Sequence, residues 1–237
     1  MAKLSNLVKA LAEVTRTPEG TVALVARQMR EGGMISTGGR GPGGAEMTPQ
    51  DCTNLLLALV SRDRAGGIAA RVADYRRSLC PHASFALDES YSDNDGKVHL
   101  RKNRPAFFDF IEDTMALGTL LDQLIERASD GRMLEYVKPL ALAHFGFKGE
   151  WTDENMYAMI GLTSTGLLKI TFTPAAYFAG VKFGGPQFAK VGEMTFRIAD
   201  DLMETAAQEW GDMTVRIEVS LRTIMSLGRL IAASPAE

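Results

Sequence analysis

Residues 18–64 read PEGTVALVARQMREGGMISTGGRGPGGAEMTPQDCTNLLLALVSRDR, and this stretch decides the predicted fold. Its first part has apolar residues at helical spacing and stops at Gly32-Gly33, where a short apolar step, Met34-Ile35, follows. The loop over residues 38–44 then contains five glycines and one arginine. Thr48 opens a second apolar helix. The stretch therefore predicts two helices joined by a glycine-arginine loop.

Capping residues set the limits of these helices. Thr17 and Pro18 are typical of a helix start, and Gly33 can take the left-handed conformation that ends the helix near residue 31. Thr48, with Asp51 three residues later, predicts a capping box for the next helix. Before both, residues 4–14 carry apolar side chains at amphipathic spacing, so a further helix precedes this pair.

The rest of the chain predicts a mixture of helices and strands. We expect helices over 68–79, 107–128 and 224–233, a hairpin from residues 157–162 and 167–173, and a strand over 214–221. Residues 81–106 are polar and contain prolines, which indicates a linker with a short hairpin over Asp95-Gly96. The predicted fold class is α+β. The predicted domains are a helical winged-helix domain over 1–80, a linker over 81–106, and an α+β domain with a small antiparallel sheet over 107–237.

Composition and charge restrict the kind of protein. The chain has 237 residues, 46% of them apolar, and a net charge of −3. Residues 1–80 have a net charge of +4, and the rest of the chain has a net charge of −7. This difference is expected if only the first part binds nucleic acid. The alternative is that the positive charge of residues 1–80 is ordinary surface charge. No membrane span and no signal peptide are indicated, and Cys52 and Cys80 are typical of reduced, buried thiols. A cytoplasmic protein is expected.

The glycine-arginine loop is suited to approach DNA. Glycines allow the backbone to come close to a groove, and an arginine neutralises phosphate or enters a narrow minor groove. Gly39, Arg40 and Gly41 are therefore predicted as DNA contacts. The alternative is a plain surface loop.

The helix before this loop is the candidate recognition helix. Its outward polar residues are Thr21, Arg27, Gln28 and Arg30. Arginine and glutamine are the side chains that recognise guanine and adenine edges in the major groove. The alternative for this face is a solvated helix surface.

The sequence predicts no enzyme, no cofactor and no metal site. No lysine follows the glycines of the loop, so it lacks the pattern of a phosphate-binding loop. Cys80 and His82 lack two further ligands for a metal, and the calcium-loop pattern around Asp93 has Lys102 at its twelfth position, where an acid is required.

The stretch VARQMREGGMISTGGRGPGGAEMTPQDCTNLLLAL resembles the winged-helix head of the MerR-type regulators, over residues 5–64. That head runs from a helix through a Gly-Leu-Ile step and a wing to a Thr/Ser-x-x-Asp helix start. The resemblance implies DNA binding, with Arg27, Arg30 and Arg40 as contacts, and it does not imply metal or drug sensing. The positions that match are Arg30, Gly33, Met34, Ile35, Arg40, Thr48, Asp51 and Leu55.

These observations predict a sequence-specific DNA-binding transcriptional regulator of bacterial or phage type. The expected partners are double-stranded DNA, a second copy of the chain in a homodimer, and RNA polymerase or another protein at the C-terminal domain, with no membrane. The alternative is a DNA-binding assembly or packaging protein of a phage-like element.

Overall fold

The computed structural model describes residues 2–38, 44–61, 67–80, 83–85, 89–92, 98–101, 106–112, 114–145, 168–173, 178–184, 190–196 and 217–233. These residues form helices together with antiparallel sheets, so the α+β class is confirmed. None of the helices in these ranges is long and apolar enough to cross a membrane.

The first four helices begin and end close to where the sequence predicts. They are α1 (Leu4–Thr15), α2 (Glu19–Glu31), α3 (Pro49–Val60) and α4 (Ile68–Arg77). The capping box of α3 is confirmed: the Asp51 amide donates to Thr48 Oγ1 at 3.2 Å, and the Thr48 amide donates to Asp51 Oδ2 at 2.9 Å. These two bonds satisfy backbone donors at the first turn and fix where α3 starts.

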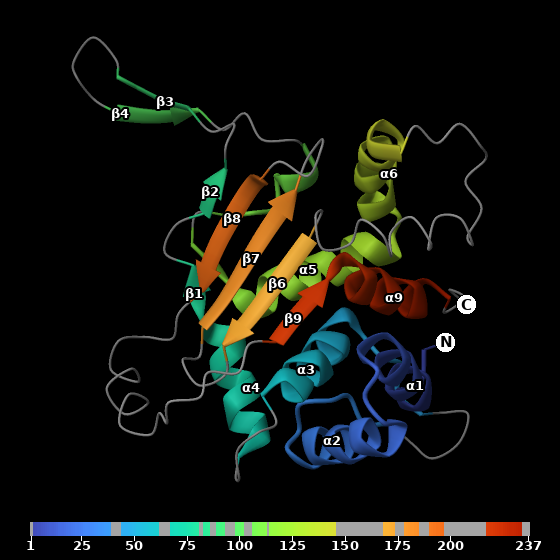
Figure 1. The fold of residues 1–237 in the computed structure, drawn as a ribbon. Helices are drawn as coiled ribbons and strands as arrows, with labels where there is room; N and C mark the ends of the chain where they lie inside the picture. Colours follow the sequence, from blue (N-terminus) through green and yellow to red (C-terminus); the bar gives the residue numbers. More distant parts are fainter. Residues whose placement is uncertain are drawn as a thin grey trace.

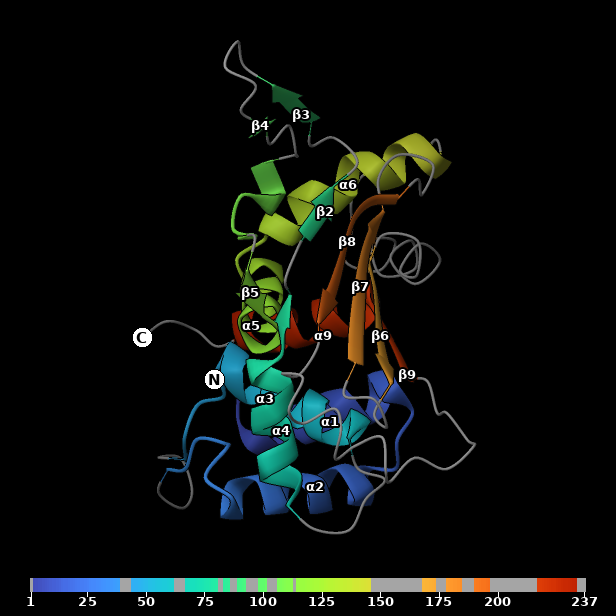
Figure 2. The ribbon, with the colours of Figure 1, turned by 90° about the vertical axis from the view of Figure 1, so that its left-hand side faces the viewer.

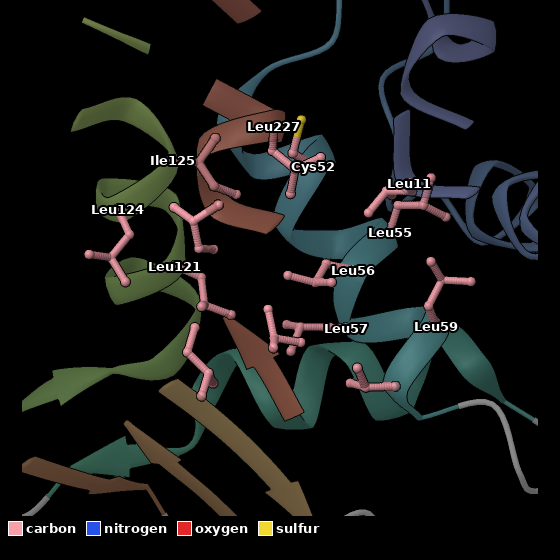
Figure 3. Close-up of a cluster of buried hydrophobic side chains, with 14 of the residues drawn as sticks. Leu11, Cys52, Leu55, Leu56, Leu57, Leu59, Leu121, Leu124, Ile125 and Leu227 are labelled. Atoms are coloured by element: carbon pink, nitrogen blue, oxygen red, sulfur yellow. The ribbon is translucent and has the colours of Figure 1, made fainter. Parts of the chain in front are cut away.

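Helix α3 is the centre of the core. Every residue from Asp51 to Val60 is buried, and α3 contacts α2, α4, α5 (Leu117–Ser129) and α9 (Leu221–Ala232). Figure 3 shows leucines of α1, α3, α5 and α9 gathered in one apolar cluster. A helix that is apolar on all sides must be surrounded, which is why the run CTNLLLALV lies in the middle of the bundle.

The main sheet has five strands in the order β2-β8-β7-β6-β9, and all its pairs are antiparallel. Figure 2 shows α5 and α9 together on one side of this sheet. Ile170 of β6 pairs with Val219 of β9, and both are buried in the core that these helices share. The strands are β2 (Ala83–Phe85), β6 (Leu168–Thr173), β7 (Phe178–Gly184), β8 (Lys190–Phe196) and β9 (Ile217–Ser220).

The described residues also form two smaller pairs of strands. Strand β1 (Leu79–Cys80) pairs with β5 (Met115–Ala116), and β3 (Glu89–Ser92) pairs with β4 (Val98–Arg101). The β3–β4 pair flanks Asp95-Gly96 and confirms that hairpin, although the turn itself lies outside the described residues. The predicted strand at 157–162 also lies outside them.

The predicted single helix over 107–128 is wrong. Residues 106–108 form a short 3-10 helix, η2 (Ala106–Phe108), strand β5 follows, and α5 begins at Leu117. The Arg127 guanidinium lies 4.1 Å from the Phe110 ring centroid, and the Phe107 ring stacks on Tyr136 of α6 (Arg132–Phe145) with centroids 4.5 Å apart. If residues 107–128 formed one continuous helix, the 17 residues that separate Phe110 from Arg127 would place these two residues about 26 Å apart along the helix axis. The aromatic residues instead fold back along α5.

The hydrophobic core does not end at the predicted domain boundary at residue 80. It runs from Ala2 to Leu227, and α1 contacts α9 while α3 contacts α5 (Figure 1). Residues 83–85, inside the predicted linker, join the main sheet as β2. The division into a head, a linker and a tail stays a prediction, but the described residues of both parts share one core.

Candidate nucleic-acid interface

Helices α1 and α2 pack against each other. A short turn joins them, and Arg16 in that turn has φ 53°, the left-handed conformation usually given to glycine. Leu7 and Leu11 of α1 and Val25 and Met29 of α2 are buried, so each helix is fixed on its apolar side. The opposite side of α2 stays exposed at the edge of the molecule, away from the sheet (Figure 1).

The structure places the predicted contacts of α2 as follows. Arg27, Gln28 and Arg30 are exposed, while Thr21 is half-buried. Arg27 Nε donates to Glu31 Oε1 at 2.7 Å; this hydrogen bond, and then the charge of Glu31, raises the pKa of Arg27. Exposed ion pairs of this kind are weak in water, so Arg27 can exchange Glu31 for another anion. Leu24, on the same helix, is 57% exposed.

The chain that leaves α2 is fixed by several hydrogen bonds. Gly33 has φ 71°, its amide donates to the Arg30 carbonyl, and the Met34 amide donates to the Met29 carbonyl. This is the Schellman pattern that ends a helix. The Ser36 amide then donates to Asp51 Oδ1 at 2.8 Å. One carboxylate, Asp51, therefore both caps α3 and holds the first arm of the glycine-arginine loop.

The second arm of the loop is held by the N-terminal segment. Lys3 Nζ donates to the Gly44 carbonyl at 2.6 Å, and the Met47 amide donates to the Ala2 carbonyl at 2.8 Å. The two arms meet at Gly38, where a Cβ atom would lie 2.2 Å from the Ala45 nitrogen. The loop thus leaves and re-enters the fold through a narrow neck that requires glycine at position 38.

The tip of the loop, with Gly39, Arg40 and Gly41, lies outside the described residues. The described arms, 34–38 and 44–48, form no strand. The wing hairpin therefore stays a prediction, and so do the contacts assigned to these three residues.

A groove of about 340 Å³ joins α2 to the neck of the loop. Its described lining contains the two cations Lys3 and Arg30 and the hydroxyls of Ser5, Ser36 and Thr37, and no acidic residue is among the described residues that line it. The described residues give the Arg30 side chain no ion pair. A groove with cations, hydroxyls and exposed backbone at glycine is suited to phosphate oxygens. The lining residues are Lys3, Leu4, Ser5, Arg30, Ser36, Thr37, Gly38, Gly44, Ala45 and Met47.

A polar network supports the segment between α2 and the loop from inside the fold. Asn54 Nδ2 donates to the Met34 carbonyl at 2.6 Å, and Arg76 Nη1 donates to Asn54 Oδ1 at 3.0 Å. Arg76 also binds Asp122 of α5 through two hydrogen bonds of 2.6 and 3.2 Å. From the sequence, Arg76 is expected only as one of the arginines on the polar side of the helix predicted over 68–79. The available signal was Asn54, a polar residue inside an apolar run.

Comparisons with known proteins give no relative for this chain: no family model, no curated protein and no solved structure matches it.

Proposed function

We propose that the chain binds double-stranded DNA as a sequence-specific transcriptional regulator, with α2 as the recognition helix. The observation that carries the proposal is the continuity between the exposed polar side of α2 and the cationic groove at the neck of the glycine-arginine loop. Arg30 belongs to both. A helix in the major groove, beside a loop that meets the adjoining backbone, requires this arrangement.

Dimensions and chemistry support this reading. Helix α2 has 13 residues, about 20 Å, and the major groove of B-DNA is about 12 Å wide. Arg27 and Gln28 can meet base edges, while Lys3 and Arg30 can meet phosphate. In the winged-helix form of the proposal, Arg40 at the tip of the loop adds a further phosphate or minor-groove contact.

The first experiment is selection of bound DNA from a random double-stranded pool with the full chain. We expect an enriched site, and a two-fold symmetric site would indicate a homodimer that meets two half-sites about one helical turn apart. The absence of retained DNA at low salt would contradict the proposal, since non-specific phosphate contacts are strongest there. A ring-sized oligomer that binds all sequences equally would favour the packaging alternative.

The second experiment tests the residues. Arg30→Ala should weaken binding to specific and random DNA and lower the slope of log affinity against log salt by about one. Gln28→Ala should reduce preference at one base position and leave random DNA unaffected. Arg132→Ala, an exposed arginine at the start of α6, is the matched control and should change neither (Figure 1). An Arg30→Ala variant with the affinity and salt slope of the wild type would exclude the groove from the interface.

A further inference from the structure

A second groove lies between α1 and α9, and its volume is about 530 Å³. It is separate from the groove at α2, since the two share none of the described residues that line them. Pockets of this size take small organic molecules. The residues that line it are Ala10, Glu13, Val14, Arg222, Ser226, Arg229 and Leu230.

The polar side of this groove is cationic. Arg222, Ser226 and Arg229 follow each other at spacings of four and three residues, which places them on one side of α9. Arg222 is exposed and Arg229 is half-buried. Glu13 also lines the groove, from α1, so the described lining holds two positive charges and one negative charge.

The remaining lining is apolar. Ala10 and Val14 come from α1 and Leu230 from α9, and both Val14 and Leu230 pack against the core while staying partly exposed. A ligand that fits both parts therefore has an anionic group for the arginines and an apolar body for these side chains. Arginine is suited to carboxylates because its planar guanidinium makes two parallel hydrogen bonds.

We propose that this groove binds a small organic anion, a carboxylate with an apolar ring or chain, through Arg222 and Arg229. Its regulatory consequence rests on the proposed DNA-binding function. Helix α1 lies between α9 and α2, and the residues just before it hold the loop through Lys3 to Gly44 and Ala2 to Met47. A ligand that binds more tightly when α1 takes one position than when it takes another favours the first position, and α2 and the loop move with α1. The ligand then changes the affinity for DNA by the same factor by which DNA changes the affinity for the ligand.

The test of the groove needs no DNA. Isothermal titration calorimetry with 1-naphthoate as the probe measures binding to the full chain, and the neutral 1-naphthalenemethanol is the matched comparison. Arg222→Gln and Arg229→Gln should each weaken naphthoate binding about tenfold, the usual loss for a hydrogen bond to a charged group. Glu13→Gln should strengthen it, because a negative charge leaves the groove. Arg132→Gln should have no effect, and circular dichroism checks that each variant is folded.

The outcomes separate the two proposals. Naphthoate binding that depends on these arginines, in a chain that retains no DNA, would support the groove and contradict the DNA-binding function. Equal binding of the acid and the alcohol, or no strengthening in Glu13→Gln, would overturn the groove proposal even if selected DNA is bound. If the wild type binds both naphthoate and DNA, saturating naphthoate should change its affinity for DNA. This change should disappear in the Arg222→Gln, Arg229→Gln double variant.

Discussion

The ion pair between Arg76 and Asp122 should couple α4 to α5 strongly. The two side chains are 18% and 25% exposed and make two hydrogen bonds, and Arg76 lies across Gly118, where a Cβ would be 2.9 Å from the Arg76 Cβ. Removing one partner of a fully buried pair costs about 3–5 kcal/mol, and an exposed pair contributes about 0–1 kcal/mol. For this partly buried pair we expect Asp122→Asn to cost about 2–3 kcal/mol.

A double-mutant cycle measures the pair itself. Arg76→Met, Asp122→Asn and the double variant are compared by urea denaturation, and a coupling energy of about 1–2 kcal/mol is expected. The matched control is the exposed pair Asp130–Arg132, with 38% and 44% exposure, for which the coupling should stay below about 1 kcal/mol.

The hydrogen bonds of Asn54, Arg76 and Asp122 should also affect the first arm of the glycine-arginine loop. Because Asn54 joins Arg76 to the Met34 carbonyl, Arg76→Met should speed amide exchange at Ser36, whose amide binds Asp51 nearby. A coupling energy equal to that of the control pair, together with unchanged exchange at Ser36, would refute the reasoning that this network supports the loop.

Three further predictions follow from single residues. Gly228→Ala should destabilise the chain by about 1–3 kcal/mol in urea, because its Cβ would lie 2.4 Å from Ala128 Cβ at the α5–α9 crossing, whereas Gly20→Ala, with open space around it, should be stabilising. Arg16→Gly should raise the melting temperature, since φ 53° strains any residue with a Cβ. Burial raises the pKa of the Cys52 thiol from 9.0 to about 12, so with the other cysteine replaced it should resist thiol reagents in the native state. Because the Cys52 thiol ionises near pH 9 in the unfolded chain and only near pH 12 in the folded one, the free energy of unfolding should be unaffected by this group below about pH 9 and should fall as the pH rises toward 12.

Local signals predicted the N-terminal helices well because those signals lie within a few residues. The Thr48–Asp51 capping box and the Gly32-Gly33 end are satisfied by neighbours in sequence, and the alternation around residue 217 predicted β9 in the same way. The helix predicted over 107–128 failed for the opposite reason. Its aromatic residues fit a helical period, but their partners, Arg127 and Tyr136, lie later in the chain.

Pairings over long separations could not be predicted from sequence patterns. Strand β2 pairs with β8, which lies more than 100 residues later in the chain. The polar sequence around Ala83 contains no pattern that predicts this pairing. The candidate site shows the same limit. Exposure of Arg27, Gln28 and Arg30 follows from helix periodicity, but the joining of Arg30 to Lys3 in one groove depends on α1 folding back against the loop.

The shared core changes what the proposed DNA-binding unit must contain. Helix α3, which holds the loop through Asp51 and Asn54, is buried on the sides that meet α5 and α9 as well as those that meet α2 and α4. Leucines of α5 and α9 complete the cluster around it (Figure 3). A recognition helix is useful only when its support is rigid, and here that support includes a helix from the C-terminal end of the chain. A groove between α1 and α9 therefore lies where a bound molecule would act on the support of α2 without contact with DNA.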